Sequence, residues 1–176
     1  MISPTTSTPE DNATETSGEN APARSISREA LNSLKIRYYN GPIRLVNDRE
    51  QLDACVDQLA GEDLLGFDTE TRPSFERGVS YPPALMQLAT RSEVFVFQFQ
   101  ALRGLGPLRR ILEDSRIIKA GVAISDDIKQ LNECWKFKPG RFVEIGTMAR
   151  ELGFKQTGLR SLAGLLLGFR ISKKEQ

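Results

Sequence analysis

Histidine is absent from all 176 residues of the chain. Its absence excludes Ser-His and Cys-His nucleophilic catalysis, histidine-ligated zinc and a histidine general base. Cysteine is scarce, because only Cys55 and Cys134 occur, and the two show no pairing pattern. Both lie on apolar stripes of expected helices, so we expect buried, reduced thiols in a reducing, cytoplasmic environment.

Long hydrophobic runs are also missing. The longest apolar stretch, Leu162 to Phe169, is far shorter than the roughly 20 residues that a membrane-spanning helix needs, so no membrane partner is expected. Residues 1–24 contain no apolar stretch of a signal peptide, and their acidic residues argue against a transit peptide. We expect a disordered tail over 1–24 and one folded domain over 25–176.

Neither sign of charge predominates, since 24 Lys and Arg residues face 23 Asp and Glu residues. Proteins that coat duplex DNA non-specifically are usually more basic, whereas an enzyme that holds a few nucleotides in a cleft need not be. The hydrophobic content of 39% and the charged content of 27% are typical of a globular domain. Composition therefore neither requires nor excludes a nucleic-acid partner.

Hydrophobic periodicity and turn residues predict an ordered series of strands and helices. Strands are expected at 43–46, 64–71, 84–90, 93–99, 117–122 and 142–145, and helices at 28–34, 49–60, 107–113, 125–135, 146–152 and 158–167. Strands joined by short connections, followed by strands alternating with helices, predict an α/β fold. Its mixed sheet would have five main strands, with helices on its faces.

Two acidic residues close the strand expected at 64–71. Asp68 and Glu70 share one face of that strand because side chains alternate along it. Neighbouring carboxylates repel one another unless a positive group lies between them, and a divalent metal with oxygen ligands is the general solution. Solvated charges at a strand end would explain the same spacing, so the pattern leaves both interpretations open.

The pair Asp126 and Asp127 opens the helix expected at 125–135. Asp127 shares the apolar stripe with Ile124 and Leu131, whereas Asp126 falls on the polar side. An acid on the apolar side is costly unless it has a partner, so Asp127 is the functional candidate. For Asp126, an interaction with the helix dipole is a sufficient explanation.

Five segments together resemble the DEDD-type 3′–5′ exonucleases, and most closely their RNase D and Werner-syndrome-type branch. The segments are Phe67-Asp-Thr-Glu70, Ala84-Leu-Met-Gln-Leu88, Lys119-Ala-Gly-Val-Ala-Ile-Ser-Asp-Asp127, Phe142-Val-Glu-Ile145 and Ser161-Leu-Ala-Gly-Leu165. Any one of them is weakly specific, but five in order are strongly so, and the resemblance runs from about residue 43 to 174.

The resemblance implies an RNase H-like fold and hydrolysis of phosphodiester bonds at the 3′ end of DNA or RNA. It implies two divalent cations, Mg²⁺ or Mn²⁺, as cofactors. By the same resemblance Asp68 would bind both cations, Glu70 would bind one and Asp127 the other. These three residues are therefore the candidate catalytic and metal-binding set.

One motif of that branch, a tyrosine four residues before a final aspartate, is missing. No tyrosine follows Tyr81 and no aspartate follows Asp127. We expect a fragment that lacks the family's C-terminal helices and is weak or inactive on its own. Its leucine-rich segment Leu159 to Phe169 would then be exposed, which favours oligomers.

Substrate contacts are expected from Arg72, Phe75, Arg77 and Lys129, although solvated charge or loop packing accounts for each equally well. Glu144 ends a strand and is interpreted as structural. An alternative function is a catalytically impaired nucleic-acid- or protein-binding module with the same fold. An aspartate-nucleophile phosphatase is less consistent with the sequence, because it needs a second aspartate where Glu70 stands.

Overall fold

The computed structural model describes residues 23–73, 78 and 81–172. Its strands are β1 (Ile43–Val46), β2 (Leu64–Thr71), β3 (Pro83–Ala89), β4 (Val94–Gln98), β5 (Ile118–Gly121) and β6 (Phe142–Glu144). Its helices are α1 (Arg28–Ser33), α2 (Arg49–Leu59), α3 (Phe99–Leu102), α4 (Leu108–Glu113), α5 (Ser125–Cys134), α6 (Ile145–Glu151) and α7 (Leu159–Leu167). The predicted tail, apart from residues 23 and 24, lies outside the described residues, as do Phe75 and Arg77.

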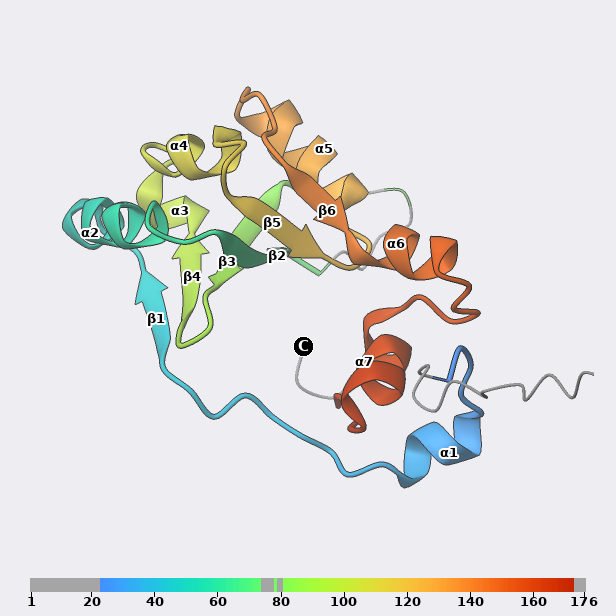
Figure 1. Ribbon diagram of the computed structural model, residues 1–176. Helices are drawn as coiled ribbons and strands as arrows, with labels where there is room; N and C mark the ends of the chain where they lie inside the picture. The colour runs from blue at the N-terminus through green and yellow to red at the C-terminus, as the bar shows by residue number, and fades with distance from the viewer. Residues whose placement is uncertain (1–22, 74–77, 79–80, 173–176) are drawn as a thin grey trace, which may run out of the picture.

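The strands form one mixed sheet in the order β1-β4-β3-β2-β5-β6 (Figure 1). The central strand β2 pairs antiparallel with β3 and parallel with β5, and β5 pairs parallel with β6. This confirms the predicted α/β class with a mixed sheet flanked by helices. The sheet has six strands rather than five, because the short segment Ile43–Val46 pairs parallel with β4 and extends the sheet at that edge.

Two helix starts follow the predicted capping residues. Ser27 accepts a hydrogen bond from the Ala30 amide at 3.0 Å, and Asp48 accepts one from the Gln51 amide at 2.9 Å. The short helix α3 was not predicted, since Phe99 continues the alternating pattern of β4. There the chain makes a single turn that ends at Arg103 in a left-handed conformation, with φ of 57°.

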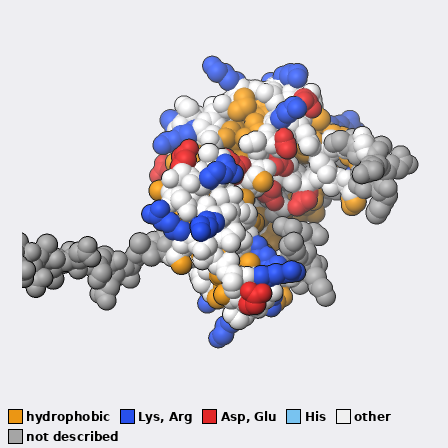
Figure 2. Space-filling model, turned by 90° about the vertical axis from the view of Figure 1, so that its right-hand side faces the viewer, with side chains coloured by type: hydrophobic (Ala, Val, Ile, Leu, Met, Phe, Trp, Pro, Cys, Tyr) orange, Lys and Arg blue, Asp and Glu red, His pale blue; other side chains and the backbone are white. Residues whose placement is uncertain are grey.

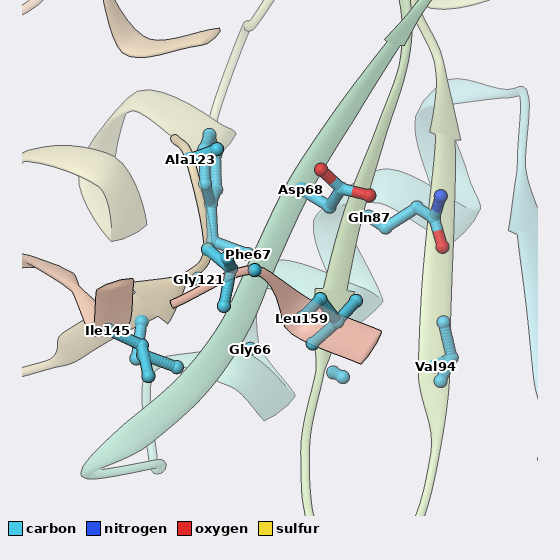
Figure 3. Close-up of a pocket in the computed structure, with 13 residues that line it drawn as sticks. Gly66, Phe67, Asp68, Gln87, Val94, Gly121, Ala123, Ile145 and Leu159 are labelled. Carbon is cyan, nitrogen blue, oxygen red and sulfur yellow. The ribbon is translucent and has the colours of Figure 1, made fainter. Parts of the chain in front are cut away.

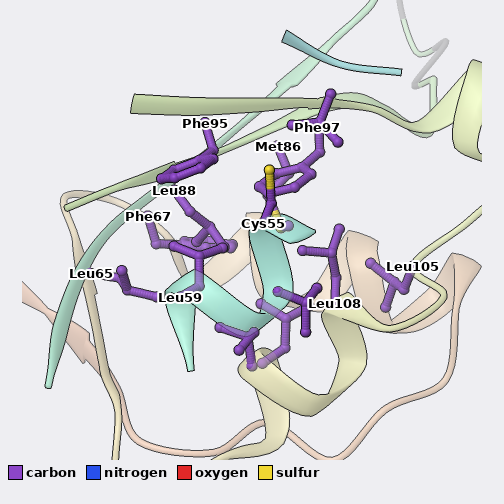
Figure 4. Close-up of a cluster of buried hydrophobic side chains, with 14 of the residues drawn as sticks. Cys55, Leu59, Leu65, Phe67, Met86, Leu88, Phe95, Phe97, Leu105 and Leu108 are labelled. Atoms are coloured by element: carbon purple, nitrogen blue, oxygen red, sulfur yellow. The ribbon is translucent and has the colours of Figure 1, made fainter. Parts of the chain in front are cut away.

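The main hydrophobic core lies between one face of the sheet and helices α2, α4 and α5 (Figures 1 and 4). Alternate residues of the three central strands enter it, as the period of two in a strand requires. Figure 4 shows these side chains around Cys55 of α2; they are Leu65, Phe67, Met86, Leu88, Phe95 and Phe97. Because successive side chains of a strand alternate between its two faces, the other side chains of these strands point to the opposite side of the sheet.

That other side is only partly covered. A second, smaller cluster contains Ala149 of α6, Phe154 and Leu162 of α7. Helix α7 lies beside α1 (Figure 1), and the Arg160 guanidinium donates to the Asn32 side chain at 2.8 Å. Large hydrophobic side chains stay exposed there, including Met148, Leu152, Leu159, Leu166 and Leu167. The predicted exposure of the leucine-rich segment Leu159 to Phe169 therefore holds for Leu159, Leu166 and Leu167, whereas Leu162 in its middle is buried.

The two cysteines differ, which corrects one prediction. Cys55 is buried in the core as expected, but Cys134 is exposed. Cys134 is the last residue of α5, and the aromatic residues that follow it, Trp135 and Phe137, take the positions at the core. No helix among the described residues is both long enough and apolar enough to span a membrane.

Candidate active site

Asp68 lies in the middle of β2, directly opposite Gln87 of β3. Figure 3 shows both side chains extending in the same direction from neighbouring strands, and both line a cavity. Glu70 follows on the same face of β2 and is half-buried. The pairing with β3 becomes irregular just after it, between Glu70 and Thr71. The two acids therefore project from the less covered side of the sheet, in the C-terminal half of β2.

Asp127 reaches the same region from the first turn of α5. Its carboxylate accepts a hydrogen bond from the hydroxyl of Thr69, the residue between the two acids of β2. Asp127 is partly buried, whereas Asp126 is exposed. This difference agrees with the predicted helical phase, in which only Asp127 lies on the inner side of α5.

The electrostatics of Asp68 reflect the three acids. Loss of water around its carboxyl group, followed by the negative charges of Asp127 and Glu70, raises the pKa of Asp68 from 3.8 to about 6. The side chain as a whole is exposed, so the carboxyl group loses only part of its hydration shell. A raised carboxyl pKa means that the folded site disfavours another negative charge.

No basic side chain in the described part of the chain forms an ion pair with these acids. The ion pairs found there join Arg44 to Glu93, Arg49 to Asp53 and Arg116 to Asp114. Uncompensated carboxylate oxygens are the donor set that Mg²⁺ and Mn²⁺ prefer, so the residues fit such a cation chemically. Across residues 23–73, 78 and 81–172, however, no three Asp, Glu or Cys side chains form a ready metal-binding group. The acids fit a cation without making a complete cage.

The raised pKa of Asp68 leads to a stability prediction. Between pH 3.8 and about 6 the folded chain binds more protons at Asp68 than the unfolded chain, so stability falls as pH rises through this window. Asp68→Asn should therefore stabilise the metal-free chain above pH 6 and give no gain near pH 4. Because the side chain is exposed, the gain is at most about 1 kcal/mol. That corresponds to about 2–4 °C in Tm.

Thermal unfolding in EDTA at both pH values measures this gain. Asp126→Asn is the matched control, because that carboxylate is exposed and makes no contact with Asp68 among the described interactions; it should give no gain at either pH. Equal Tm values for the unaltered chain and Asp68→Asn at pH 7.5 would contradict the predicted repulsion.

The loop between β5 and α5 carries Asp127 into position. A β-carbon at Gly121 would lie 2.4 Å from the Phe67 carbonyl oxygen, so only glycine allows β5 and β2 to approach this closely. Ala123 has φ of 63°, a left-handed conformation that is uncommon for residues other than glycine. The Glu144 carboxylate accepts hydrogen bonds from the Ala123 and Ile124 amides. Glu144 is thus tied to the backbone, in agreement with its structural interpretation.

The cavity beside Asp68 has a volume of about 470 Å³. Small residues on adjacent strands line it, together with Ile145 and Leu159 at the starts of α6 and α7 (Figure 3). The lining includes Gly66, Ala89, Ala120, Gly121, Ala123 and Ile145. This volume is in the range of small-molecule sites, about 300–1,000 Å³. The carboxylate of Asp68 therefore stands at the edge of a largely apolar hollow.

The other predicted substrate contacts are less clearly connected to this site. Arg72 is exposed, and its guanidinium carbon lies 5.3 Å from the centre of the Tyr81 ring. Lys129 is exposed on α5. Figure 2 shows Asp and Glu side chains gathered near the middle of one face, with Lys and Arg side chains around them. Phe75 and Arg77 stay predictions, since they lie outside the described residues.

Two residues at the site escaped prediction. Thr69 is buried and holds Asp127, although its position between two acids drew attention only to those acids. Gly121 lies in the segment from Lys119 to Asp127, but the sequence alone does not show why a glycine is needed there. A hydroxyl residue facing inward between two candidate ligands, and a glycine ending a strand before the helix that carries a third, are the signals that could have identified them.

Comparison with known proteins connects this geometry to a family. Residues 43–176 match the model of a protein family described as 3′-5′ exonuclease. The mouse bifunctional 3′-5′ exonuclease/ATP-dependent helicase WRN is 31% identical over 96 residues, which cover 53% of this chain and 7% of that protein. The chain therefore spans a small part of the length of this relative.

Solved structures share the fold at low sequence identity. Escherichia coli RNase D superposes with a TM-score of 0.67 at 19% identity, covering 75% of this chain and 35% of RNase D. The EXD2 exonuclease domain, in crystals soaked in Mn and GMP, superposes with a TM-score of 0.52 at 24% identity, covering 73% of this chain and 70% of that domain. The family match covers most of the chain, and the expected RNase H-like exonuclease fold is confirmed. The chain belongs to the 3′–5′ exonuclease family.

Proposed function

We propose that this chain is the catalytic-fold part of a metal-dependent exonuclease that hydrolyses phosphodiester bonds at the 3′ end of DNA or RNA. The observation that carries the proposal is that the charges of Asp127 and Glu70 act on Asp68, which lines an open cavity, in a member of an exonuclease family. The negative charges of Asp127 and Glu70 act on Asp68, and the described part of the chain supplies no ion-pair partner for these acids.

In this proposal Asp68, Glu70 and Asp127 hold two divalent cations, with Asp68 shared between them. Bound Mg²⁺ or Mn²⁺ would activate a water molecule and stabilise the charge that develops on the leaving oxygen. The EXD2 domain soaked in Mn and GMP supports a site of this kind in the shared fold. Thr69 would orient Asp127 through its hydroxyl group, and β2 would keep Asp68 and Glu70 on one face.

The cavity gives the terminal nucleotide a place beside the acids. Its largely apolar lining suits the face of a base, and Asp68 would hold a cation beside the phosphate. Gln87 supplies an amide that can both donate and accept hydrogen bonds. The candidates for contacts with the rest of the nucleic-acid strand are still Arg72, Phe75, Arg77 and Lys129.

The final aspartate of the related branch, and the tyrosine four residues before it, have no counterpart after Asp127 in these 176 residues. We therefore propose that this chain alone binds one cation well and the second weakly, and that its turnover is low. Removing one member of a catalytic group commonly costs orders of magnitude in rate. The exposed leucine side chains would also favour the formation of oligomers.

A second candidate is a binding module for nucleic acid or protein that retains the fold without catalysis. It is favoured by one observation, namely that no three acidic or cysteine side chains form a ready metal-binding group among the described residues. The clustered, unpaired acids oppose it, because they repel a phosphate backbone unless a cation is bound.

Two measurements distinguish the exonuclease from the binding module. The first is calorimetric titration with Mn²⁺, and the second is the shortening of strands labelled near the 5′ end. We expect saturable Mn²⁺ binding that is lost in Asp68→Ala, and slow Mn²⁺-dependent shortening from the 3′ end. Single-stranded DNA, single-stranded RNA and recessed 3′ ends are compared in parallel, so the preferred substrate is read from the same assay. Equal Mn²⁺ binding by the unaltered chain and Asp68→Ala would reject the metal site and leave the binding module.

A further inference from the structure

Glu144 has an unusual set of partners for an acid at a strand end. Its Oε1 atom accepts hydrogen bonds from the Ala123 amide at 2.8 Å and the Gly146 amide at 3.0 Å. Its Oε2 atom accepts one from the Ile124 amide at 2.7 Å. One carboxylate thus joins the end of β6, the start of α6 and the loop that leads into α5. Charge-assisted bonds of this length are stronger than bonds between neutral groups.

The loop needs this acceptor because its own residues do not supply one. Ala123 is left-handed and is followed by right-handed Ile124, so two successive amides point to the same place and form a cradle for an anion. Ile124 is the N-cap of α5, and its side chain makes no capping hydrogen bond. Glu144 therefore takes over, from a neighbouring strand, the part that Ser, Thr or Asp usually plays at a helix start.

The position of this loop sets the position of Asp127. The Ile124 carbonyl accepts the first backbone bond of α5, from the Ile128 amide at 3.0 Å. Asp127 lies within that first turn, so a shift of Ile124 moves its carboxylate relative to Asp68 and Thr69. Gly121 fixes the other end of the loop against the Phe67 carbonyl. The loop is consequently held at both ends, and Glu144 is its anchor on the side of the helix.

We infer that Glu144 is a positioning residue for the cation site, acting through the loop at Val122–Ile124 rather than as a ligand. Three of its roughly four acceptor positions are already used by backbone amides, so the direct contacts to a cation are assigned to Asp68, Glu70 and Asp127. This inference rests on the proposed function, and it adds Glu144 as an acid that orients Asp127 without binding the cation.

Two substitutions of Glu144 distinguish the effect of its charge from the effect of its side-chain length. Glu144→Gln keeps the length, but its amide nitrogen must face at least one backbone amide, so one of the three bonds is lost. Glu144→Asp keeps the charge but is one methylene shorter. Outer groups that orient metal ligands typically change metal affinity by about 10- to 100-fold. We expect a loss of that size for Glu144→Gln and a smaller one for Glu144→Asp.

The measurement is Mn²⁺ affinity of the 176-residue chain, by calorimetry, at a temperature where circular dichroism shows every variant to be folded. Leu31→Ala is the control for general destabilisation, because Leu31 is buried on α1 against Gly164, outside the loop. We expect Leu31→Ala to lower Tm and leave Mn²⁺ affinity unchanged.

Three results would overturn the inference, and they can be told apart. Unchanged affinity in Glu144→Gln would mean that the loop does not need its anchor. Equal losses in Glu144→Gln and Leu31→Ala would mean that Glu144 acts only through overall stability. Absence of Mn²⁺ binding by the unaltered chain would reject the proposed function, and the positioning role with it.

Discussion

Asp127→Asn should reduce Mn²⁺ affinity by about 100-fold or more, since even groups that only orient metal ligands are worth about 10- to 100-fold. The asparagine side chain has the same size and can still accept the Thr69 hydroxyl, so the fold and Tm should change little. Only the negative charge is removed. In a protein with measurable turnover, nucleotide release should fall by orders of magnitude together with the affinity.

Asp126→Asn is the matched control, because it makes the same chemical change one residue earlier on the same helix. Asp126 is exposed and lies in the first turn of α5. Its charge there interacts favourably with the helix dipole, by about 0.3 kcal/mol. We expect wild-type Mn²⁺ affinity and rate. Similar losses in both variants, or a larger loss in Asp126→Asn, would show that the assignment of Asp127 is wrong.

Features confined to one element were predictable from the sequence. Ser27 and Asp48 cap their helices as expected, and alternation along β2 correctly separates buried Leu65 and Phe67 from Asp68. The difference between exposed Asp126 and partly buried Asp127 also follows from the helical period alone. Each of these features depends on spacing within a few residues, which is the information that a single sequence carries most directly.

Features that join distant elements were not predictable. The hydrogen bond from Thr69 to Asp127 joins residues 58 positions apart, and the bonds from Ala123 and Ile124 to Glu144 join residues 21 and 20 positions apart. Lys119 is fully buried, with its Nζ donating to the Asp114 and Ile117 carbonyls, and this burial lowers its pKa to about 8. No local sequence pattern predicts that a lysine will occupy a core position of a strand, as Lys119 does.

Gly121→Ala should be among the most disruptive single substitutions near the site. Its β-carbon would lie 2.4 Å from the Phe67 carbonyl oxygen and 2.4 Å from Cγ2 of Ile124, far inside van der Waals contact. The carbonyl belongs to a central strand in the tightly packed core, so it has little freedom to move. Relief requires β5 to move from β2, or the loop to move from the sheet. We expect a loss of about 3 kcal/mol, or about 6–12 °C in Tm.

The same displacement would reach the acids, because Phe67 precedes Asp68 and Ile124 precedes the turn that carries Asp127. Mn²⁺ affinity should therefore fall even at temperatures where Gly121→Ala is folded. Gly158→Ala is the control: it lines the same cavity, but a β-carbon there would meet nothing within 4 Å. It should leave Tm and Mn²⁺ affinity nearly unchanged. If Gly121→Ala matched this control, the close contact between β5 and β2 would not be what holds Asp68 and Asp127 together.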